Sequence, residues 1–166
     1  MIRLTEKLDH FHEPAAELAL PFDTRQKTRF RAVLSDGREV AVTLPRGGIL
    51  RGGDLLTGPD GVVVIVQAAP EAVSTAFHRD PRMLAVGAYH LGNRHVQLQV
   101  GDSWLRYRAD HVLDEMVEGI GLSVFQEQAP FEPEGGAYDG ASPQLVNVHT
   151  GGVPDHHHHH HGHRHD

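Results

Sequence analysis

Short stretches of apolar and β-branched residues, separated by turn residues, run through the first seventy positions and predict strands. In residues 29–34 and 39–44 apolar side chains recur at alternate positions, and the Asp36-Gly37 pair between them is typical of a hairpin turn. We expect further strands at residues 2–7, 16–20 and 62–66, with a turn at 58–61. The glycine-rich stretch 45–54 is expected to be a loop between strands, because no helix with a Lys-Ser or Lys-Thr pair follows it. Residues 1–70 therefore read as a small all-β domain.

The pattern changes to helical spacing after residue 70. Residues 72–78 resemble a strand, and Asp80-Pro81 then supplies an N-cap followed by proline at the first helical position. Leu84, Ala88 and Leu91 recur at spacings of four and three, which places them on one face of a helix. The pair Gly92-Asn93 indicates where that helix ends.

A second cycle of strand and helix follows. Strands are expected at residues 96–100 and 104–107, a helix capped by Asp110 carries one apolar face and ends at Gly121, and residues 122–125 begin a last strand. The order strand, helix, strand, strand, helix, strand is that of a ferredoxin-like βαββαβ domain, which we place at residues 71–138. The fold class is therefore α+β. From about residue 130 the periodicity is lost, which predicts a linker into a disordered, flexible His-rich tail at residues 139–166.

Histidine is the outstanding feature of the composition. Eight of the 15 histidines lie in the last eleven residues, namely His156, His157, His158, His159, His160, His161, His163 and His165. Six consecutive histidines are also the usual length of an expression tag. This run, however, continues as Gly-His-Arg-His-Asp, which favours a native metal-binding tract.

Imidazole nitrogen suits borderline ions such as Ni²⁺, Zn²⁺ and Cu²⁺, and a run of histidines can wrap such an ion with little selectivity. Binding should fail as pH falls through the ordinary histidine pKa of about 6.5, because a protonated imidazole has no lone pair to donate. Storage or capture of metal suits such a tail better than catalysis does.

Charge and composition exclude several classes of protein. The chain has no cysteine, so disulfides and thiolate metal sites are impossible. A formal net charge of −7 argues against nucleic acid as a partner. No apolar run is long enough to cross a membrane, and the first residues carry no secretory signal, so a cytoplasmic location is expected. The motifs of hydrolases, nucleotide-binding folds and zinc proteases are absent, so we do not expect an enzyme.

Two histidines of the folded part are candidate metal ligands. His95 lies at the end of the first predicted helix, where a histidine is commonly a capping or surface residue. If the apolar face of that helix formed a two-fold interface, His95 would meet its own copy and make half of a square-planar or octahedral site. His111 begins the second predicted helix, where the helix dipole favours a neutral imidazole, although an exposed first-turn residue is an equal alternative.

Three ordered motifs carry a resemblance that periodicity does not supply. They are Tyr89-His90-Leu91-Gly92-Asn93-Arg94-His95, Asp110-His111-Val112-Leu113-Asp114-Glu115-Met116, and the stretch from Gln128 to Tyr138. With these motifs the chain resembles the urease accessory protein family UreE over about residues 1–138. Many members of that family also end in a His-rich tail, which favours a native tail here.

The resemblance implies a homodimeric nickel metallochaperone that delivers Ni²⁺ for assembly of the urease active site. It implies a β domain like the peptide-binding domain of Hsp40-type chaperones, followed by a ferredoxin-like domain that binds metal and dimerises. The family's central ligand falls on His95. Only the second histidine of a family His-x-His pair is retained, as His111, while His149 and the tail histidines could supply further ligands. The implied partners are the urease GTPase UreG and the urease activation complex.

Two other hypotheses remain at this stage. In one, the protein is a passive buffer for nickel or zinc in which the tail alone matters. In the other, it is a peptide-binding chaperone module for which metal is incidental. Copper precedes nickel in affinity at imidazole sites, so nickel preference cannot be read from the ligand type.

Overall fold

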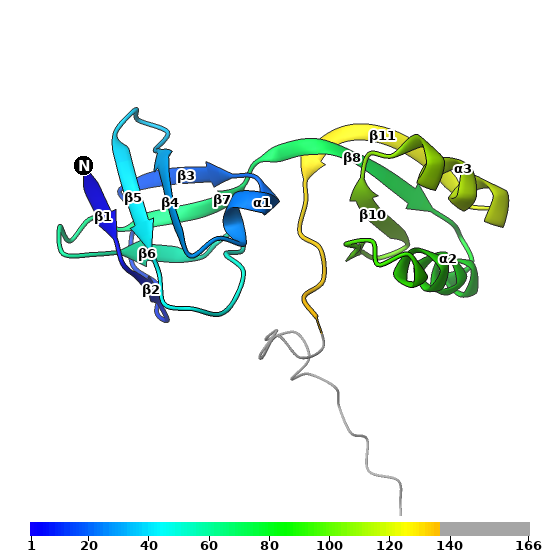
Figure 1. Ribbon diagram of the computed structural model, residues 1–166, viewed down its shortest axis with the longest axis horizontal. Helices are drawn as coiled ribbons and strands as arrows, with labels where there is room; N and C mark the ends of the chain where they lie inside the picture. The colour runs from blue at the N-terminus through cyan, green and yellow to red at the C-terminus, as the bar shows by residue number, and fades with distance from the viewer. Residues whose placement is uncertain (137–166) are drawn as a thin grey trace, which may run out of the picture.

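Two sheets near the amino terminus enclose one apolar core. In the computed structural model, which describes residues 1–136, a three-stranded sheet has the order β1-β5-β4 and a four-stranded sheet the order β2-β6-β7-β3 (Figure 1). The strands are β1 (Ile2–Leu4), β2 (Glu6–Leu8), β3 (Ala16–Leu20), β4 (Arg29–Val33), β5 (Glu39–Thr43), β6 (Leu55–Thr57) and β7 (Val64–Ala68). Leu4, Leu18, Val40, Leu56 and Val64 are fully buried between the two sheets. This all-β unit confirms the predicted character of the first part of the chain.

The single strand predicted at residues 2–7 is wrong in one respect. The strand is interrupted at Thr5, whose amide donates to the Thr57 carbonyl at 2.8 Å. As a result β1 and β2 belong to different sheets. Strand β6 and the short helix α1 (Phe22–Arg25) were not predicted. Both are too short for a periodic pattern to reveal them.

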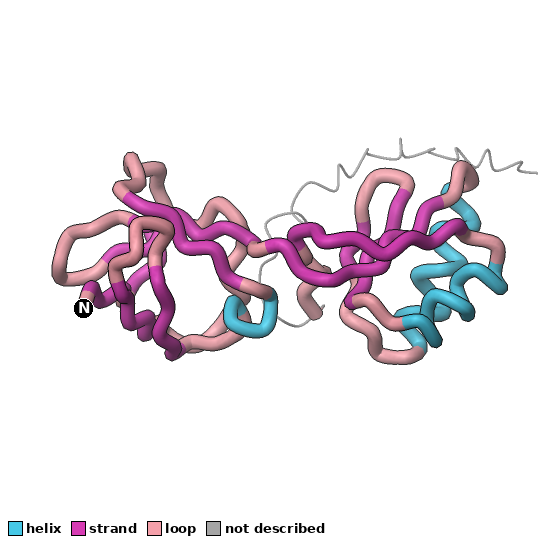
Figure 2. Tube along the Cα trace, turned by 90° about the horizontal axis from the view of Figure 1, so that it is seen from above, coloured by secondary structure: helices cyan, strands magenta, loops and turns pink. Residues whose placement is uncertain are grey.

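The second unit is ferredoxin-like, as predicted. It comprises β8 (Pro70–Phe77), α2 (Pro81–Asn93), β9 (Gln99–Val100), β10 (Trp104–Arg108), α3 (His111–Ile120) and β11 (Ser123–Pro130). Its strands pair antiparallel in the order β11-β8-β10-β9, and both helices cover the same face of the sheet (Figure 2). Apolar residues of the helices pack there on Ala76 and Leu105 of the sheet. The α+β fold class is thereby confirmed.

Helix ends follow the capping signals in the sequence. The Asp80 carboxylate accepts from the Arg82 amide at 2.9 Å, with Pro81 in the first turn. Helix α3 ends at Gly121, whose φ of 119° lies in the left-handed region that glycine adopts without steric cost. No helix in the described part of the chain is long and apolar enough to span a lipid bilayer.

The residues after β11 do not form the linker that the sequence predicted from about residue 130. Phe131 is fully buried and packs edge-on against Phe22 of α1, with ring centroids 5.7 Å apart. The buried Arg25 guanidinium pairs with Glu132 and donates to the Phe131 carbonyl. The prediction failed because the partners of these residues lie more than a hundred positions earlier in the chain. The tail predicted at 139–166 lies outside the described residues.

Candidate metal centre

His95 terminates α2 in a Schellman motif. Its amide donates to the Gly92 carbonyl at 3.0 Å, and the Val96 amide donates to the Leu91 carbonyl at 3.3 Å. Val96 packs into the same apolar cluster as the fully buried Leu91, which is the hydrophobic contact that accompanies this motif. The backbone thus fixes the Cα of His95 firmly while its side chain is exposed.

His95 has a backbone conformation that is uncommon for a residue other than glycine. Its φ is 56°, in the left-handed region, where this position of a Schellman motif normally carries glycine. A residue with a side chain costs about 1–2 kcal/mol there. In residues 1–136 only one other non-glycine residue, Ser103, has a positive φ. The His95 side chain is exposed, so it makes no buried contact that offsets this cost. Backbone strain without such compensation indicates a functional role for the imidazole.

His111 occupies the first turn of α3 and is also exposed. The preceding residue, Asp110, caps the helix, since its carboxylate accepts from the amides of Val112 and Leu113 at 2.9 and 3.1 Å. This cap fixes the backbone from which the His111 side chain projects.

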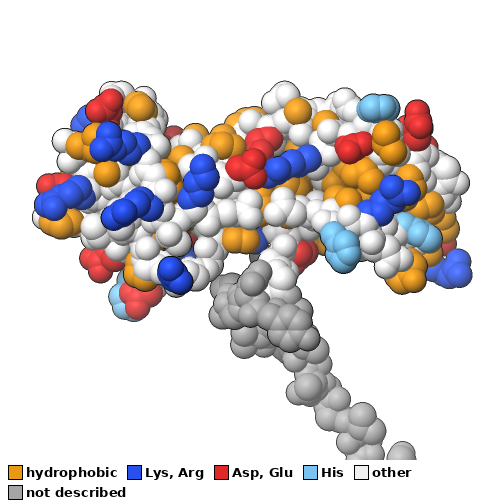
Figure 3. All heavy atoms as spheres, viewed as in Figure 1, with side chains coloured by type: hydrophobic (Ala, Val, Ile, Leu, Met, Phe, Trp, Pro, Cys, Tyr) orange, Lys and Arg blue, Asp and Glu red, His pale blue; other side chains and the backbone are white. Residues whose placement is uncertain are grey.

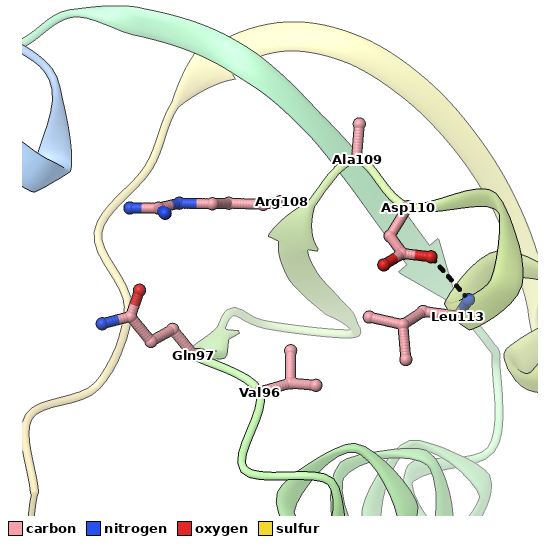
Figure 4. Close-up of a pocket in the computed structure, with 6 residues that line it drawn as sticks. All are labelled: Val96, Gln97, Arg108, Ala109, Asp110 and Leu113. Atoms are coloured by element: carbon pink, nitrogen blue, oxygen red, sulfur yellow. Dashed lines mark hydrogen bonds between the residues drawn. The ribbon is translucent and has the colours of Figure 1, made fainter.

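A pocket of about 150 Å³ is lined by one sequence neighbour of each candidate ligand. One wall contains Val96, the neighbour of His95, and the other contains Asp110, the neighbour of His111 (Figure 4). Val96 and Leu113 point into it, and Arg108 and Gln97 line the side nearer to the segment that follows β11. Each candidate ligand is therefore next in sequence to a residue that lines this pocket, although neither His95 nor His111 lines it.

Polar contacts between side chains hold α3 against the sheet. The Tyr107 hydroxyl donates to Asp114 at 2.7 Å and the Gln126 amide donates to the same carboxylate at 2.9 Å. Burial opposes ionisation of Asp114, but these donors and the nearby Ser74 hydroxyl outweigh it and lower the pKa of the carboxyl. Burial, together with the bond to Asp114, raises the pKa of Tyr107. The network fixes the helix that carries His111.

One copy of the folded part does not assemble a complete metal site. Among residues 1–136 no group of three or more His, Asp or Glu side chains is placed to hold one ion. His90 makes an edge contact with Tyr89, and the Nδ1 of His78 accepts from the Asp80 amide. His149, His156 to His161, His163 and His165 lie outside the described residues.

The two helices that carry the candidate ligands also carry exposed apolar side chains. Tyr89, on the last turns of α2, is 65% exposed, and Val112, next to His111, is 53% exposed. Apolar surface that is contiguous and exposed is typical of a region that another molecule covers. Sequence reasoning missed both of them, as well as the left-handed backbone of His95. The left-handed backbone of His95 could have been inferred from the sequence, because no glycine follows Asn93 to take the left-handed position after the helix.

Comparison with known proteins covers both units. The family model for the UreE urease accessory protein, N-terminal domain, matches residues 3–69, and that for its C-terminal domain matches residues 71–166. Urease accessory protein UreE of Alkalilimnicola ehrlichii is 59% identical over 140 residues, covering 84% of this chain and 86% of that protein. The same-named protein of Pseudomonas putida strain W619 is 54% identical over 142 residues, covering 85% and 88%.

A third relative extends along almost the entire chain. Urease accessory protein UreE of Nitrosospira multiformis is 44% identical over 165 residues, which is 99% of this chain and 88% of that protein. Together with the two domain matches, these identities show that the chain belongs to the UreE family of urease accessory proteins.

Proposed function

We propose that this protein is a nickel metallochaperone that captures Ni²⁺ and delivers it for assembly of the urease active site. The family places the chain in urease maturation as an accessory protein. The observation that carries the metal role is the exposed imidazole of His95, held by a strained backbone on a firmly anchored helix end. Imidazole nitrogen is a suitable donor for Ni²⁺.

The proposed site is completed by a second copy of the chain. A single imidazole cannot hold an ion selectively, and a two-fold axis near the end of α2 would bring two copies of His95 to one ion. The exposed Tyr89 and Val112 supply apolar surface that such a homodimer would cover. His111 and His149 are the proposed additional ligands. Zn²⁺ and Cu²⁺ are expected to bind the same donors.

The tail is proposed to collect metal. Its histidines, His156 to His161, His163 and His165, raise the local concentration of bound ions near the interface site. The match of the C-terminal family model through residue 166 supports a native tail rather than a tag. The proposed domains are the β-rich domain at residues 1–70, the ferredoxin-like domain at 71–138 and the His-rich tail at 139–166.

The proposed partners are the urease GTPase UreG and the urease activation complex, and the proposed location is the cytoplasm. Delivery of a metal requires no catalytic group in this chain, and the family is named for an accessory role. Ligand exchange between nitrogen and oxygen donors is sufficient for the hand-over.

Calorimetric nickel titration tests the interface site. We expect His95→Ala to lose the tightest binding event, about one ion per dimer, and to keep the dimer and the fold. His12→Ala is the matched control, because His12 is an exposed histidine of the amino-terminal unit. Unchanged tight binding in His95→Ala would remove His95 from the site.

Deletion of residues 151–166 separates the proposal from a passive buffer. A chaperone with an interface site keeps about one tightly bound ion per dimer after the deletion, whereas a buffer loses nearly all binding. The remaining alternative is a peptide-binding module for which metal is incidental. A pull-down of urease components with the metal chelated tests it, because such a module would capture as much of these proteins without metal as with it.

A further inference from the structure

Strand β11 is a long, unpaired edge of the ferredoxin-like sheet. In the described part of the chain it is the outermost strand and pairs only with β8, from Ser123 opposite Phe77 to Pro130 opposite Pro70. Figure 1 shows it along the upper margin of this unit. Among its eight residues only Pro130, the last, has no amide to donate. The backbone groups that point away from β8 can therefore pair with a further strand.

The opposite edge of the same sheet is shorter and partly covered. Strand β9 has only two residues, and the segment that follows β11 runs beside it. The Glu134 amide donates to the Leu98 carbonyl at 2.8 Å, and the Glu132 amide donates to the Gln99 side chain at 2.9 Å. The chain thus protects its short edge with its own residues and leaves the long edge open to another molecule.

Two exposed aromatic rings lie beside the open edge. Val124 and Ala76 pack among the helices, so the neighbouring Phe125 and Phe77 point to the opposite face of the sheet. Within the described residues that face carries no helix (Figure 2). The two rings contact each other edge to face, with centroids 6.0 Å apart, and are 47% and 46% exposed. Every second side chain of a strand added to β11 would lie on this apolar side.

The other side chains of an added strand would face carboxylates of α3. Asp114 accepts from Gln126 of β11 at 2.9 Å, and Glu118 lies one helical turn further along the same side of α3. Glu118 and Glu115 are exposed and have no ion pair among residues 1–136.

The acidic character extends over the whole of α3 and β11. Residues 109–136 contain seven Asp or Glu residues and no Lys or Arg. Figure 3 shows Asp and Glu side chains along the upper part of this unit, where these two elements lie. On the sheet face, Glu127 is paired with Arg106 at 3.4 Å, so the unpaired carboxylates are those of the helix side. One side of the open edge is therefore apolar and the other acidic.

We propose that β11 binds an extended segment of another protein in which apolar residues alternate with lysine or arginine. The segment adds to the four-stranded sheet as a fifth strand, with its apolar side chains beside Phe125 and its cations toward Glu118. A second copy of this chain fits the edge poorly, because it would bring two acidic α3 helices together. Strand β11 carries none of the proposed metal ligands, so this inference goes beyond the proposed function.

Fluorescence anisotropy with a defined peptide tests this proposal. The probe is a fluorescein-labelled peptide of sequence KVRIKVTK, titrated with the full chain in the presence of EDTA. We expect saturable binding that weakens about tenfold in the double variant Glu115→Lys, Glu118→Lys, because two attractive charges become repulsive. Lysine near the carboxyl end of α3 suits the helix dipole, so the variant keeps its fold. The matched control, Glu13→Lys, Glu39→Lys, reverses two exposed charges of the other unit and should leave the affinity unchanged.

Two further measurements distinguish strand addition from attraction of charge alone. The peptide KPRPKPTK keeps all four cations but lacks three amides, so we expect it not to bind. Hydrogen exchange of the amides of residues 123–129 should slow when KVRIKVTK is bound. The proposal is overturned if the probe does not bind at about 1 mM, the weak end of specific affinity. It is also overturned if KPRPKPTK binds equally well, if the Glu115, Glu118 variant binds as the wild type does, or if exchange in β11 does not change. Slower exchange in β11 at higher protein concentration without peptide would assign the edge to a second copy and overturn it as well.

Discussion

Replacement of His95 by glycine should make the protein more stable and remove its proposed function. The side chain is exposed, so its loss removes little buried surface. Both hydrogen bonds of the Schellman motif involve backbone atoms only and are retained. What changes is the cost of a φ of 56°, which glycine adopts freely.

The magnitude follows from two opposing contributions. Relief of the left-handed conformation contributes about 1–2 kcal/mol. The greater freedom of glycine in the unfolded chain takes back about 0.5–1 kcal/mol. We therefore expect the free energy of unfolding of His95→Gly to rise by about 0.5–1 kcal/mol. His95→Ala keeps the unfavourable φ and should be near neutral, and His95→Asn should lie between, because asparagine tolerates this region.

Urea unfolding at one protomer concentration, with EDTA present, measures these differences. Nickel titration of the same variants should show loss of the tight site in all three. A His95→Gly variant that is less stable than His95→Ala would refute the argument from strain. A His95→Gly variant that is more stable and still binds nickel tightly would refute the argument that the strain is kept for the metal.

Four further outcomes are expected, three from contacts near the candidate site and one from the pair of Arg25 and Glu132. Asp110→Ala should lower the free energy of unfolding by about 1 kcal/mol in thermal melts, because the α3 cap is lost. Tyr107→Phe should lower the free energy of unfolding by about 1 kcal/mol near pH 7, since the partly buried hydrogen bond from its hydroxyl to Asp114 disappears. The pKa of Asp114 is lower in the folded protein than in the unfolded chain, where it is about 4, so the ionised carboxylate stabilises the fold above pH 4. The difference in free energy of unfolding between wild type and Asp114→Asn should therefore shrink as pH falls below about 4 and be constant above about pH 6. Glu132→Ala should cost about 1–3 kcal/mol in urea unfolding, because Arg25 stays buried without its carboxylate while Glu132 itself is partly exposed.

The start of α2 and both ends of α3 could be predicted because the interactions that define them are local. Asp80, Pro81, Asp110 and Gly121 act within a few residues of where they stand, and the structure uses each as predicted. The ferredoxin-like order followed from these ends and from the strand runs between them.

Features that depend on distant partners could not be predicted. Phe131 lies in a stretch rich in proline and glycine, and its burial depends on Phe22 across the other unit. The interruption between β1 and β2 at Thr5 depends on a hydrogen bond to Thr57, which lies far later in the sequence. His95 could be chosen as a ligand from its motif, whereas its strained φ requires the folded helix end.

On the proposed function, the same features explain why a metal would be held and yet released. The chain has no cysteine, so no thiolate can bind the ion and none must be displaced when it leaves. His95 is anchored through its backbone and exposed through its side chain, so a ligand can be positioned without an enclosing cage. A cage within one copy would retain nickel, whereas a ligand set divided between two copies and their tails can be exchanged one donor at a time. An accessory protein that passes a metal on needs the second arrangement.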